Sequence, residues 1–504
     1  QGNVRARSED AVMSADNLVM LARPDRRSLK SVTADGRACY ESGGIGEIRR
    51  LKGHRIVFGL REVGDRLEKI SILGEAEMYL QYSDGERALY GAEIYVDMDP
   101  AGRVPAMISS RGDVRFLMKS GSGRTRLSGE RLAARFAAGT ESLESVRVEG
   151  RAAMSAEGGA DSPGQRLLAD EIQIYFRSFD GETALEKLQA RGSVSWTLEA
   201  AKARGAADRA PSRTLQASLL EMSYAPKGDS LDAGRADGGV VVEEVSAGGR
   251  GDGCVRRMTA EKLRFDFFPE GNRIKSLSAE ENVRIACEDP AGHSADPGAK
   301  RFVSESDRLQ ARFDLVEGES ALRTASQWGR FRYRDAFWTA EADRSDYDAL
   351  KDLLVLEGSP RISSKETGTT AGERVEYDRK ALTVSVLGRV RSRFAGREGR
   401  SLLGTSSSSS PGVITAQMLR YWTTTGLARY SGGVRLLSEN SQLQAGVLEI
   451  AEGGEIAEAR DDVVHLVPPG DSSGGVSDQE PSKGAKNSGS LPIVIKSSGM
   501  KYLR

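Results

Sequence analysis

Residues able to catalyse a reaction or bind a metal are few in this sequence, and they form no common site. His54, His293 and His465 stand far apart, and none lies in the His-Glu-x-x-His spacing of a zinc site. The glycine-rich segment 120–125 lacks the Lys-Ser/Thr pair of a phosphate-binding loop, and no Gly-x-Ser-x-Gly nucleophile motif occurs. We therefore predict a protein that is not an enzyme and has no metal and no cofactor.

Acidic residues are numerous, but they recur at the start of a repeated pattern instead of forming one pair. A carbohydrate-active enzyme on a β-scaffold needs two carboxylates that converge on one concave face. The sequence offers no pair that stands out from the repeat, as Asp170 and Glu261 illustrate by occupying equivalent positions in two copies. This enzyme class is the least favoured of the alternatives.

The three cysteines are Cys39, Cys254 and Cys287. Cys254 and Cys287 are equidistant from the turn at 269–272, so a hairpin without a register slip would place them opposite each other. Such a pair can form a disulfide in an oxidising compartment. Two unpaired strand cysteines are the alternative, and a non-reducing peptide digest analysed by mass spectrometry distinguishes the two.

A repeat with glycine at its centre organises the whole chain. The first four glycines are spaced by 38 residues three times in succession, each within alternating apolar and polar residues, as in 70–80. Period-two alternation predicts a β-strand with one buried face. We count twelve copies; Glu281 and Asp461 take the central position in two of them, and the others have Gly36, Gly74, Gly112, Gly150, Gly192, Gly238, Gly329, Gly358, Gly388 and Gly432.

Each copy has two halves joined by turn residues. The first half often begins with a small residue and an acid or amide, as in Ala169-Asp170, and then alternates. Turns such as 99–102 and Asp180-Gly181 separate the halves, which predicts one hairpin of two long strands per copy. Glycine inside a strand usually marks a bulge, a bend or a close backbone approach. At one shared position it predicts that every hairpin bends there.

The predicted fold is therefore all-β: an elongated β-jelly-roll of about twelve stacked bent hairpins that form a trough with an apolar interior. Large side chains on the alternating face are candidates to line that interior and to bind an apolar ligand. They are Met78, Met98, Phe116, Phe136, Ile174, Phe176, Trp196, Phe265, Phe267, Phe313, Tyr377 and Tyr421. The alternative is that they pack only on one another, as in the core of a β-sandwich.

Composition divides the chain into repeats and loops. The predicted segments are a flexible N-terminal segment (1–13), the repeat array (14–398), a Ser/Gly-rich loop (399–412), continuing repeats (413–467), a disordered Gly/Ser/Pro linker (468–490) and the start of a further repeat (491–504). Because Lys+Arg (72) and Asp+Glu (73) nearly cancel, a nucleic-acid surface is not expected. No stretch approaches the ~20 apolar residues of a membrane span, and we expect no signal peptide or anchor in this chain.

Several copies resemble the repeat of the lipopolysaccharide-transport bridge proteins, the organic-solvent-tolerance-like family. The shared pattern is a small residue and an acid, alternation up to an aromatic residue, a turn, and then apolar-x-Ala-x-Gly-x-Val. It is carried by ADEIQIYF…ALEKLQARGSVSW (169–196), TAEKLRFDFFPEGNRIKSLSAEENVRI (259–285), TAGERVEYDRKALTVSVLGRVRS (370–392) and ITAQMLRYWTTTGLARYSGGVRLLS (414–438).

The resemblance implies a β-jelly-roll trough in the bacterial periplasm that carries lipopolysaccharide from the inner to the outer membrane, with acyl chains inside and sugars outside. It implies partners that pair with the terminal edge strands: the inner-membrane exporter complex at one end and the outer-membrane translocon at the other. The residues alone leave a second function open, a structural or adhesive β-solenoid with a dry core.

Overall fold

A computed structural model describes most of the chain as β-strands joined by turns. The described residues are 4–8, 10–24, 28–42, 48–62, 66–82, 85–120, 123–157, 164–179, 182–198, 212–228, 230–245, 255–269, 273–288, 302–316, 319–335, 338–364, 368–394, 412–438, 441–451, 456–467 and 493–503. Within these ranges there are 29 strands and no helix. The prediction of an all-β array of stacked hairpins is confirmed.

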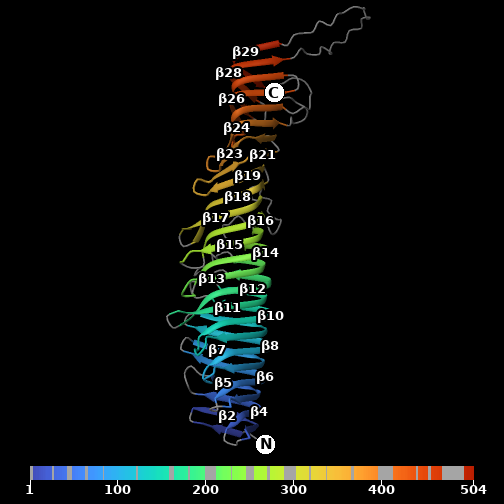
Figure 1. The fold of residues 1–504 in the computed structure, drawn as a ribbon. Coiled ribbons are helices and arrows are strands. Elements are labelled where there is room, and N and C mark those ends of the chain that lie inside the picture. The colour runs from blue at the N-terminus through green and yellow to red at the C-terminus, as the bar shows by residue number, and fades with distance from the viewer. Residues whose placement is uncertain are drawn as a thin grey trace, which may run out of the picture. The chain divides into compact units, whose positions relative to one another are not determined.

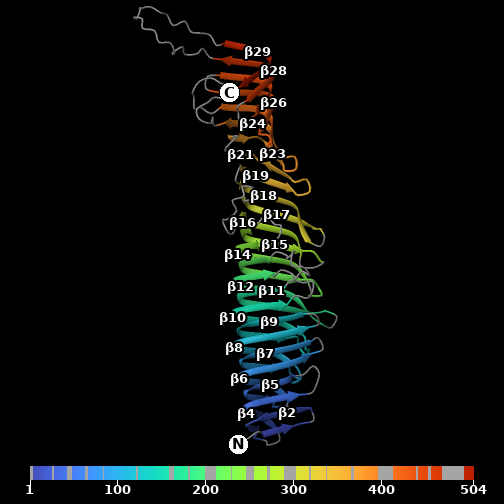
Figure 2. The same cartoon turned by 180° about the vertical axis from the view of Figure 1, so that it is seen from behind.

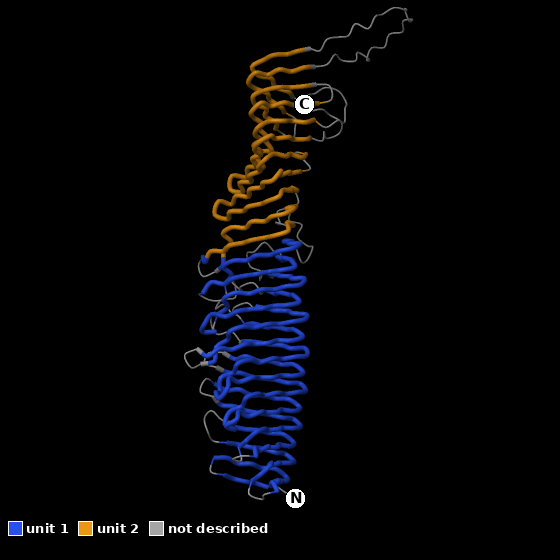
Figure 3. Tube along the Cα trace, in the orientation of Figure 1, with its two compact units in different colours: residues 1–300, 315–320 blue, residues 301–314, 321–504 orange. Residues whose placement is uncertain are grey.

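The chain divides into two compact units (Figure 3). Unit 1 comprises residues 1–300 and 315–320. Its strands are β1 (Val4–Arg7), β2 (Ala11–Ala15), β3 (Asn17–Ala22), β4 (Leu29–Ser42), β5 (Ile48–Leu60), β6 (Leu67–Tyr82), β7 (Gly85–Met98), β8 (Pro105–Ser120), β9 (Gly123–Phe136), β10 (Leu143–Glu157), β11 (Gln165–Phe179), β12 (Glu182–Leu198), β13 (Ser212–Tyr224), β14 (Leu231–Val245), β15 (Val255–Phe267) and β16 (Ile274–Glu288).

Unit 2 comprises residues 301–314 and 321–504. It contains the greater parts of the first two strands named here and all of the others. They are β17 (Phe302–Val316), β18 (Glu319–Asp335), β19 (Trp338–Asp348), β20 (Leu353–Glu357), β21 (Arg361–Ser364), β22 (Gly368–Ala371), β23 (Arg374–Asp378), β24 (Thr383–Phe394), β25 (Gly412–Trp422), β26 (Leu427–Ser438), β27 (Ser441–Ala451), β28 (Ile456–Val467) and β29 (Ile493–Leu503).

Within each unit, most strands that follow one another in sequence also pair with one another (Figures 1 and 2). The exceptions include β2 and β3, which both pair with β4, and β20 and β21, which both pair with β19. In unit 1, β6 pairs antiparallel with β5 and β7, and β12 pairs with β11 and β13. In unit 2, β25 pairs with β24 and β26 in the same way. Each pair is a hairpin of the kind that the alternating pattern predicts.

A β-bulge bends the strands at the position of the recurrent glycine. On β6, Gly74 and Glu75 both have left-handed φ values, +74° and +51°, and together they lie opposite the single residue Ala92 of β7. Because two residues of one strand lie opposite a single residue of its partner, the ladder is locally disrupted and the strand bends. We call the half of a strand between this bend and the hairpin turn the turn arm, and the other half the linker arm.

All ten predicted glycines adopt this conformation, with φ between +70° and +81°. The two copies without glycine bend as well, because Glu281-Asn282 and Asp461-Asp462 take left-handed φ values of +53° to +65°. Asn and Asp tolerate this region better than most residues. The predicted bend is thus confirmed in all twelve copies.

Close packing at the bend explains why the neighbouring strand begins with a small residue and an acid. A Cβ on Gly112 would lie 2.7 Å from the Cβ of Ala92 on the preceding strand. In the next copy, a Cβ on Gly129 of β9 would lie 2.5 Å from Cγ1 of Val148 on β10. The small residue therefore faces the buried corner. In several copies the acid that follows it touches the bend glycine, as Glu130 does with Gly150 and Asp170 with Gly192, whereas Ala92 takes this place beside Gly112.

The apolar interior lies between the two arms. The alternating face of the turn arms contributes Ile72, Ile94 and Val146, and that of the linker arms contributes Leu51 and Leu89, all of them 0–1% exposed. Burying such side chains contributes about 25 cal/mol for each Å² of apolar surface. This interior accounts for most of the favourable folding energy, since the outer faces are charged.

The observed boundaries correct the predicted organisation at the N-terminus. Val4–Arg7 forms β1 and pairs with β2, whose first residues Ala11–Met13 also lie in the segment that the sequence assigned as flexible. Backbone pairing with β2 orders this polar stretch although its side chains bury little. Strand β25 begins at Gly412, inside the predicted loop, and most of residues 399–412 and all of 468–490 lie outside the described residues.

The bend predicts a difference between two glycine-to-alanine substitutions in unit 1. Gly112 and Gly139 have φ values of +76° and +68°, so alanine strains the backbone at both by about 1–2 kcal/mol. A Cβ at Gly139 meets nothing within 4 Å, whereas one at Gly112 collides with Ala92. We expect Gly112→Ala to lose a further ~1–3 kcal/mol of unfolding free energy in urea. Equal losses of unfolding free energy in Gly112→Ala and Gly139→Ala would show that the contact with Ala92 does not affect stability.

Candidate functional site

The candidate site is the interior of the trough, and both arms supply its predicted residues. Phe116 and Trp196 lie on linker arms, whereas Ile174 and Phe265 lie on turn arms. Ten of the twelve predicted residues are buried, with 1–8% of their surface exposed: Met78, Met98, Phe116, Phe136, Ile174, Phe176, Trp196, Phe265, Phe267 and Tyr421. Phe313 and Tyr377 are half-buried. The interior placement of these residues is therefore observed, whereas ligand binding by them stays a prediction.

Aromatic side chains bring the two arms into contact. In unit 1 the rings of Trp196 (linker arm of β12) and Phe265 (turn arm of β15) stack with centroids 6.4 Å apart. Tyr40 and Phe58 make a similar contact at 5.3 Å. In unit 2, Trp338 and Tyr421 meet edge to face at 5.8 Å. At each of these three pairs, a side chain of a linker arm is in contact with a side chain of a turn arm.

Glycine gives Phe265 the room to turn into the trough. Gly234 lies directly opposite Phe265 in the β14–β15 ladder, and a Cβ at Gly234 would collide with the phenyl ring. Only 3% of Phe265 is exposed. The ring is therefore buried against Trp196 of the linker arm.

Polar side chains also occupy interior positions, and the sequence reasoning missed them. Ser304, Ser306, Ser345, Thr370 and Ser392 are all buried and all belong to unit 2. Ser392 is two residues after buried Val390 and therefore occupies an inward position of β24. The sequence contains a signal for them, because Ser or Thr replaces an apolar residue at these inward positions of the alternating pattern.

Three of the polar contacts in unit 2 join a linker arm to a turn arm. The Ser304 hydroxyl donates to Oε1 of Gln327 at 2.8 Å. The Tyr430 hydroxyl forms a hydrogen bond with Ser392, whose hydroxyl lies 2.7 Å from that of Thr370. The third contact joins His465 and Tyr502.

The ladder register proves that the Ser392–Tyr430 bond crosses the trough. Tyr430 lies in line with Leu419 and, through it, with Val386, before the bend of β24. Ser392 lies six residues beyond Val386, on the far side of the bend at Gly388. Burial raises the pKa of the Tyr430 phenol, and the hydrogen bond with Ser392 opposes that rise.

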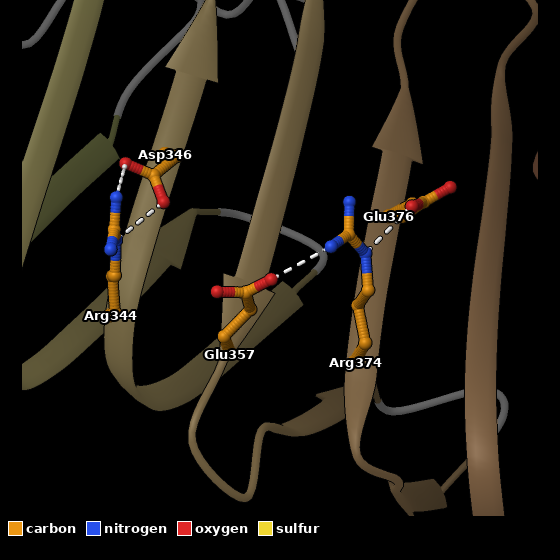
Figure 4. A network of polar contacts seen from close by, with 5 residues as sticks. All are labelled: Arg344, Asp346, Glu357, Arg374 and Glu376. Carbon is orange, nitrogen blue, oxygen red and sulfur yellow. Dashed lines mark hydrogen bonds and ion pairs between the residues drawn. The ribbon is translucent and has the colours of Figure 1, made fainter.

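The outer face carries ion pairs instead. Figure 4 shows Arg374 between Glu357 (2.7 Å) and Glu376 (2.8 Å), and Arg344 beside Asp346 at 2.6 Å. Their side chains are 32–48% exposed. Such exposed pairs contribute about 0–1 kcal/mol each. They are typical of a solvated strand face.

Ion pairs also recur at the bends. Arg37, which follows the bend glycine Gly36, binds Asp16 of the preceding strand segment at 2.7 Å, and Arg389 binds Glu373 at 2.5 Å. The hydrogen bond from Arg37 lowers the pKa of Asp16. In these copies the acid at the start of the first half is therefore a corner residue, consistent with its interpretation as part of the repeat.

The cysteine geometry differs from the simple hairpin expectation. Two register shifts in the β15–β16 ladder, at the bend and near the turn, place Cys287 opposite Arg256. Cys287 is buried and disulfide-bonded, and Cys39 is a free thiol. Cys254 lies outside the described residues.

Two strands present apolar residues at sheet edges. On β3, which pairs with β4, Val19, Met20 and Leu21 are 51–57% exposed. On β29, which pairs with β28, Val494 and Ile495 are 52% and 41% exposed. Unpaired strand edges favour association with further strands.

Within the described ranges no cluster of three or more His, Cys, Asp or Glu side chains could hold a metal ion. The same ranges contain no helix long and apolar enough to span a membrane. No protein-family model and no curated protein matches this chain.

The His465–Tyr502 pair predicts an acid-sensitive end of unit 2. His465 Nδ1 lies 2.9 Å from the Tyr502 hydroxyl, and burial lowers the histidine pKa from its ordinary value of 6.5. The folded state then takes up this proton less readily than the unfolded state, so stability present above pH 6.5 is lost as the pH falls below it. We expect the amides of β29 to exchange with deuterium severalfold faster at pH 5.5 than at 7.5, after correction for intrinsic rates.

The matched control for this prediction is His465→Gln, which removes the titrating group and keeps a polar side chain. The pH dependence of exchange in β29 should disappear in this variant, while exchange in β6 and β7 of unit 1 stays the same in both proteins. A pH dependence in β29 that persists in His465→Gln would assign the effect to another group.

Proposed function

We propose that this protein is a passive carrier of lipopolysaccharide in the periplasm, with acyl chains in the interior of the trough and sugars outside. The observation that carries the proposal is that each bent hairpin presents apolar side chains from both arms to one shared interior, as Ile174 and Phe116 do. The resemblance of the repeats to lipopolysaccharide-transport bridge proteins supports the same cargo. Such a carrier performs no chemistry, which agrees with the lack of catalytic motifs in the sequence.

Loading would exchange one set of apolar contacts for another. Trp196 and Phe265 bury each other in the closed trough. An acyl chain between them would keep the same surfaces away from water, so the hydrophobic contribution changes little. The cost of opening therefore comes mainly from side-chain rearrangement and from any polar bond that must be broken.

The edge strands suit the partners that the proposal requires. A strand of the inner-membrane exporter complex or of the outer-membrane translocon would add to β3 or β29 by β-augmentation. The exposed apolar residues Val19, Met20 and Val494 would then be covered by the added strand and its side chains.

A structural spacer with a dry core is the second candidate, and one observation favours it. The interior residues are already buried without any ligand, and aromatic contacts such as Tyr40–Phe58 and Trp338–Tyr421 join the two arms. In that function the arms would never part, and the interior would serve only to hold the hairpins together.

Site-specific photocrosslinking separates the two functions. A photoreactive amino acid at Phe265 faces the interior, whereas one at the adjacent Arg264 faces solvent on the same strand. In cells that make lipopolysaccharide we expect an adduct at Phe265 and none at Arg264. No adduct at Phe265, Phe116 or Ile174 in a folded protein would exclude the carrier and favour the spacer.

Charge substitution provides an independent test. Ile174→Asp places a carboxylate in the trough, and Gln173→Asp places one on the outer face next to it. Burying an unpaired charge is strongly unfavourable, so we expect the first variant to lose lipid binding and the second to keep it. Circular dichroism must show both folded, and unchanged lipid binding by folded Ile174→Asp would count against the carrier.

A further inference from the structure

The buried polar residues of the two units differ in what they join. In unit 1 the described buried polar or charged residues are Arg87, Asp99 and Ser110. Asp99 accepts the backbone N–H groups of Arg103 and Val104 within its own turn. Ser110 donates to the Glu93 carbonyl of the neighbouring strand in the same arm at 2.9 Å. Neither bond crosses the trough.

Arg87 occupies the outer end of the linker arm of β7, where the register places it beside Leu80 and Met118. Its side chain is 5% exposed, so it is buried on the inward face of that arm. Two aromatic contacts join the arms of unit 1: the stacking of Trp196 on Phe265 and the contact of Tyr40 with Phe58.

Unit 2 has hydrogen bonds across the trough at three separate levels. They are Ser304–Gln327 near its first strands, the Thr370–Ser392–Tyr430 chain in the middle, and His465–Tyr502 at its last strands. Tyr430 is 1% exposed and Ser392 is fully buried. We call these three sets the cross-trough latches.

The geometry points to a division of labour that rests on the proposed carrier function: acyl chains are held in unit 1, while the cross-trough latches keep unit 2 closed to them. An acyl chain that entered unit 2 would break each latch it passed and leave hydroxyl groups buried without a partner. In unit 1, an acyl chain would separate contacts such as that of Trp196 with Phe265 and replace them with contacts to its own apolar surface. The latches are thus specificity-determining contacts that set which length of the trough takes lipid.

The test uses the full chain with purified lipopolysaccharide and a photoreactive amino acid at four buried positions. Two of them, Phe116 and Phe265, are in unit 1, and two, Val386 and Leu448, are in unit 2. We expect adducts at the unit 1 positions to exceed those at the unit 2 positions by about tenfold or more, the ratio expected for breaking one buried hydrogen bond.

Removing a latch should open unit 2. The triple variant Ser392→Ala, Thr370→Val and Tyr430→Phe keeps an apolar interior of similar shape. In this variant we expect the yield of lipopolysaccharide adduct at Val386 to rise toward the yield at the unit 1 positions. A second, independent latch is removed by Ser304→Ala with Gln327→Leu, read out at Leu309. Thermal unfolding checks that each variant is folded, and Tyr430→Phe alone serves if the triple variant is not.

Each outcome separates the inference from the function on which it rests. Equal labelling of both units in the native chain would overturn the division and leave the carrier function standing. No label at any of the four positions would overturn the carrier function and the division with it. Labelling confined to unit 1, with folded latch variants still unlabelled at Val386 and Leu309, would overturn the latches as its cause.

Discussion

Two consecutive left-handed residues at the centre of a strand are the constraint on which this structure depends. Gly112 and Asp113 place two residues opposite one, and that mismatch turns an otherwise flat ribbon back on itself. A flat hairpin with the same alternation would expose its apolar face to water. Because the bulge recurs at the same level in successive hairpins, the corners align and the apolar faces of the two arms meet.

The side chains around the bend follow from that backbone. The glycine has no Cβ because the preceding strand lies against it, and the small residue at the inner corner, such as Gly129, avoids a β-branched neighbour. The acid on the outer corner pairs with an arginine in several copies, as Asp16 does with Arg37. These pairs are exposed, so they contribute little energy. Burial of the apolar side chains between the two arms stabilises the bent strand. The small residues at the corner only remove the clashes that would prevent the bend.

One backbone design carries two different interiors. Unit 1 closes on apolar and aromatic contacts, of which Trp196–Phe265 is the clearest, and unit 2 adds hydrogen bonds between its arms. Apolar contacts can be exchanged for a lipid at little cost, whereas a buried hydrogen bond is costly to break without a replacement. Under the proposed carrier function, the identity of a few inward residues would then decide which part of the chain takes lipid.

The sequence by itself determined the all-β class, the twelve copies and the bend, because period-two alternation and a glycine at a fixed place are local features of the chain. It also assigned twelve large residues to the interior, and ten of them are buried there, since successive side chains of a strand point to opposite faces; Phe313 and Tyr377 are only half-buried. It could not decide which residues meet across the trough: Ser392 and Tyr430, or His465 and Tyr502, are 38 and 37 positions apart and join only because a bend folds one arm over the other. The register of Cys287 and the pairing of β1 were likewise decided by the tertiary structure. A register shift changes the partner of every residue beyond it. An edge strand such as β1 can form through backbone hydrogen bonds to its neighbour, without an apolar pattern of its own.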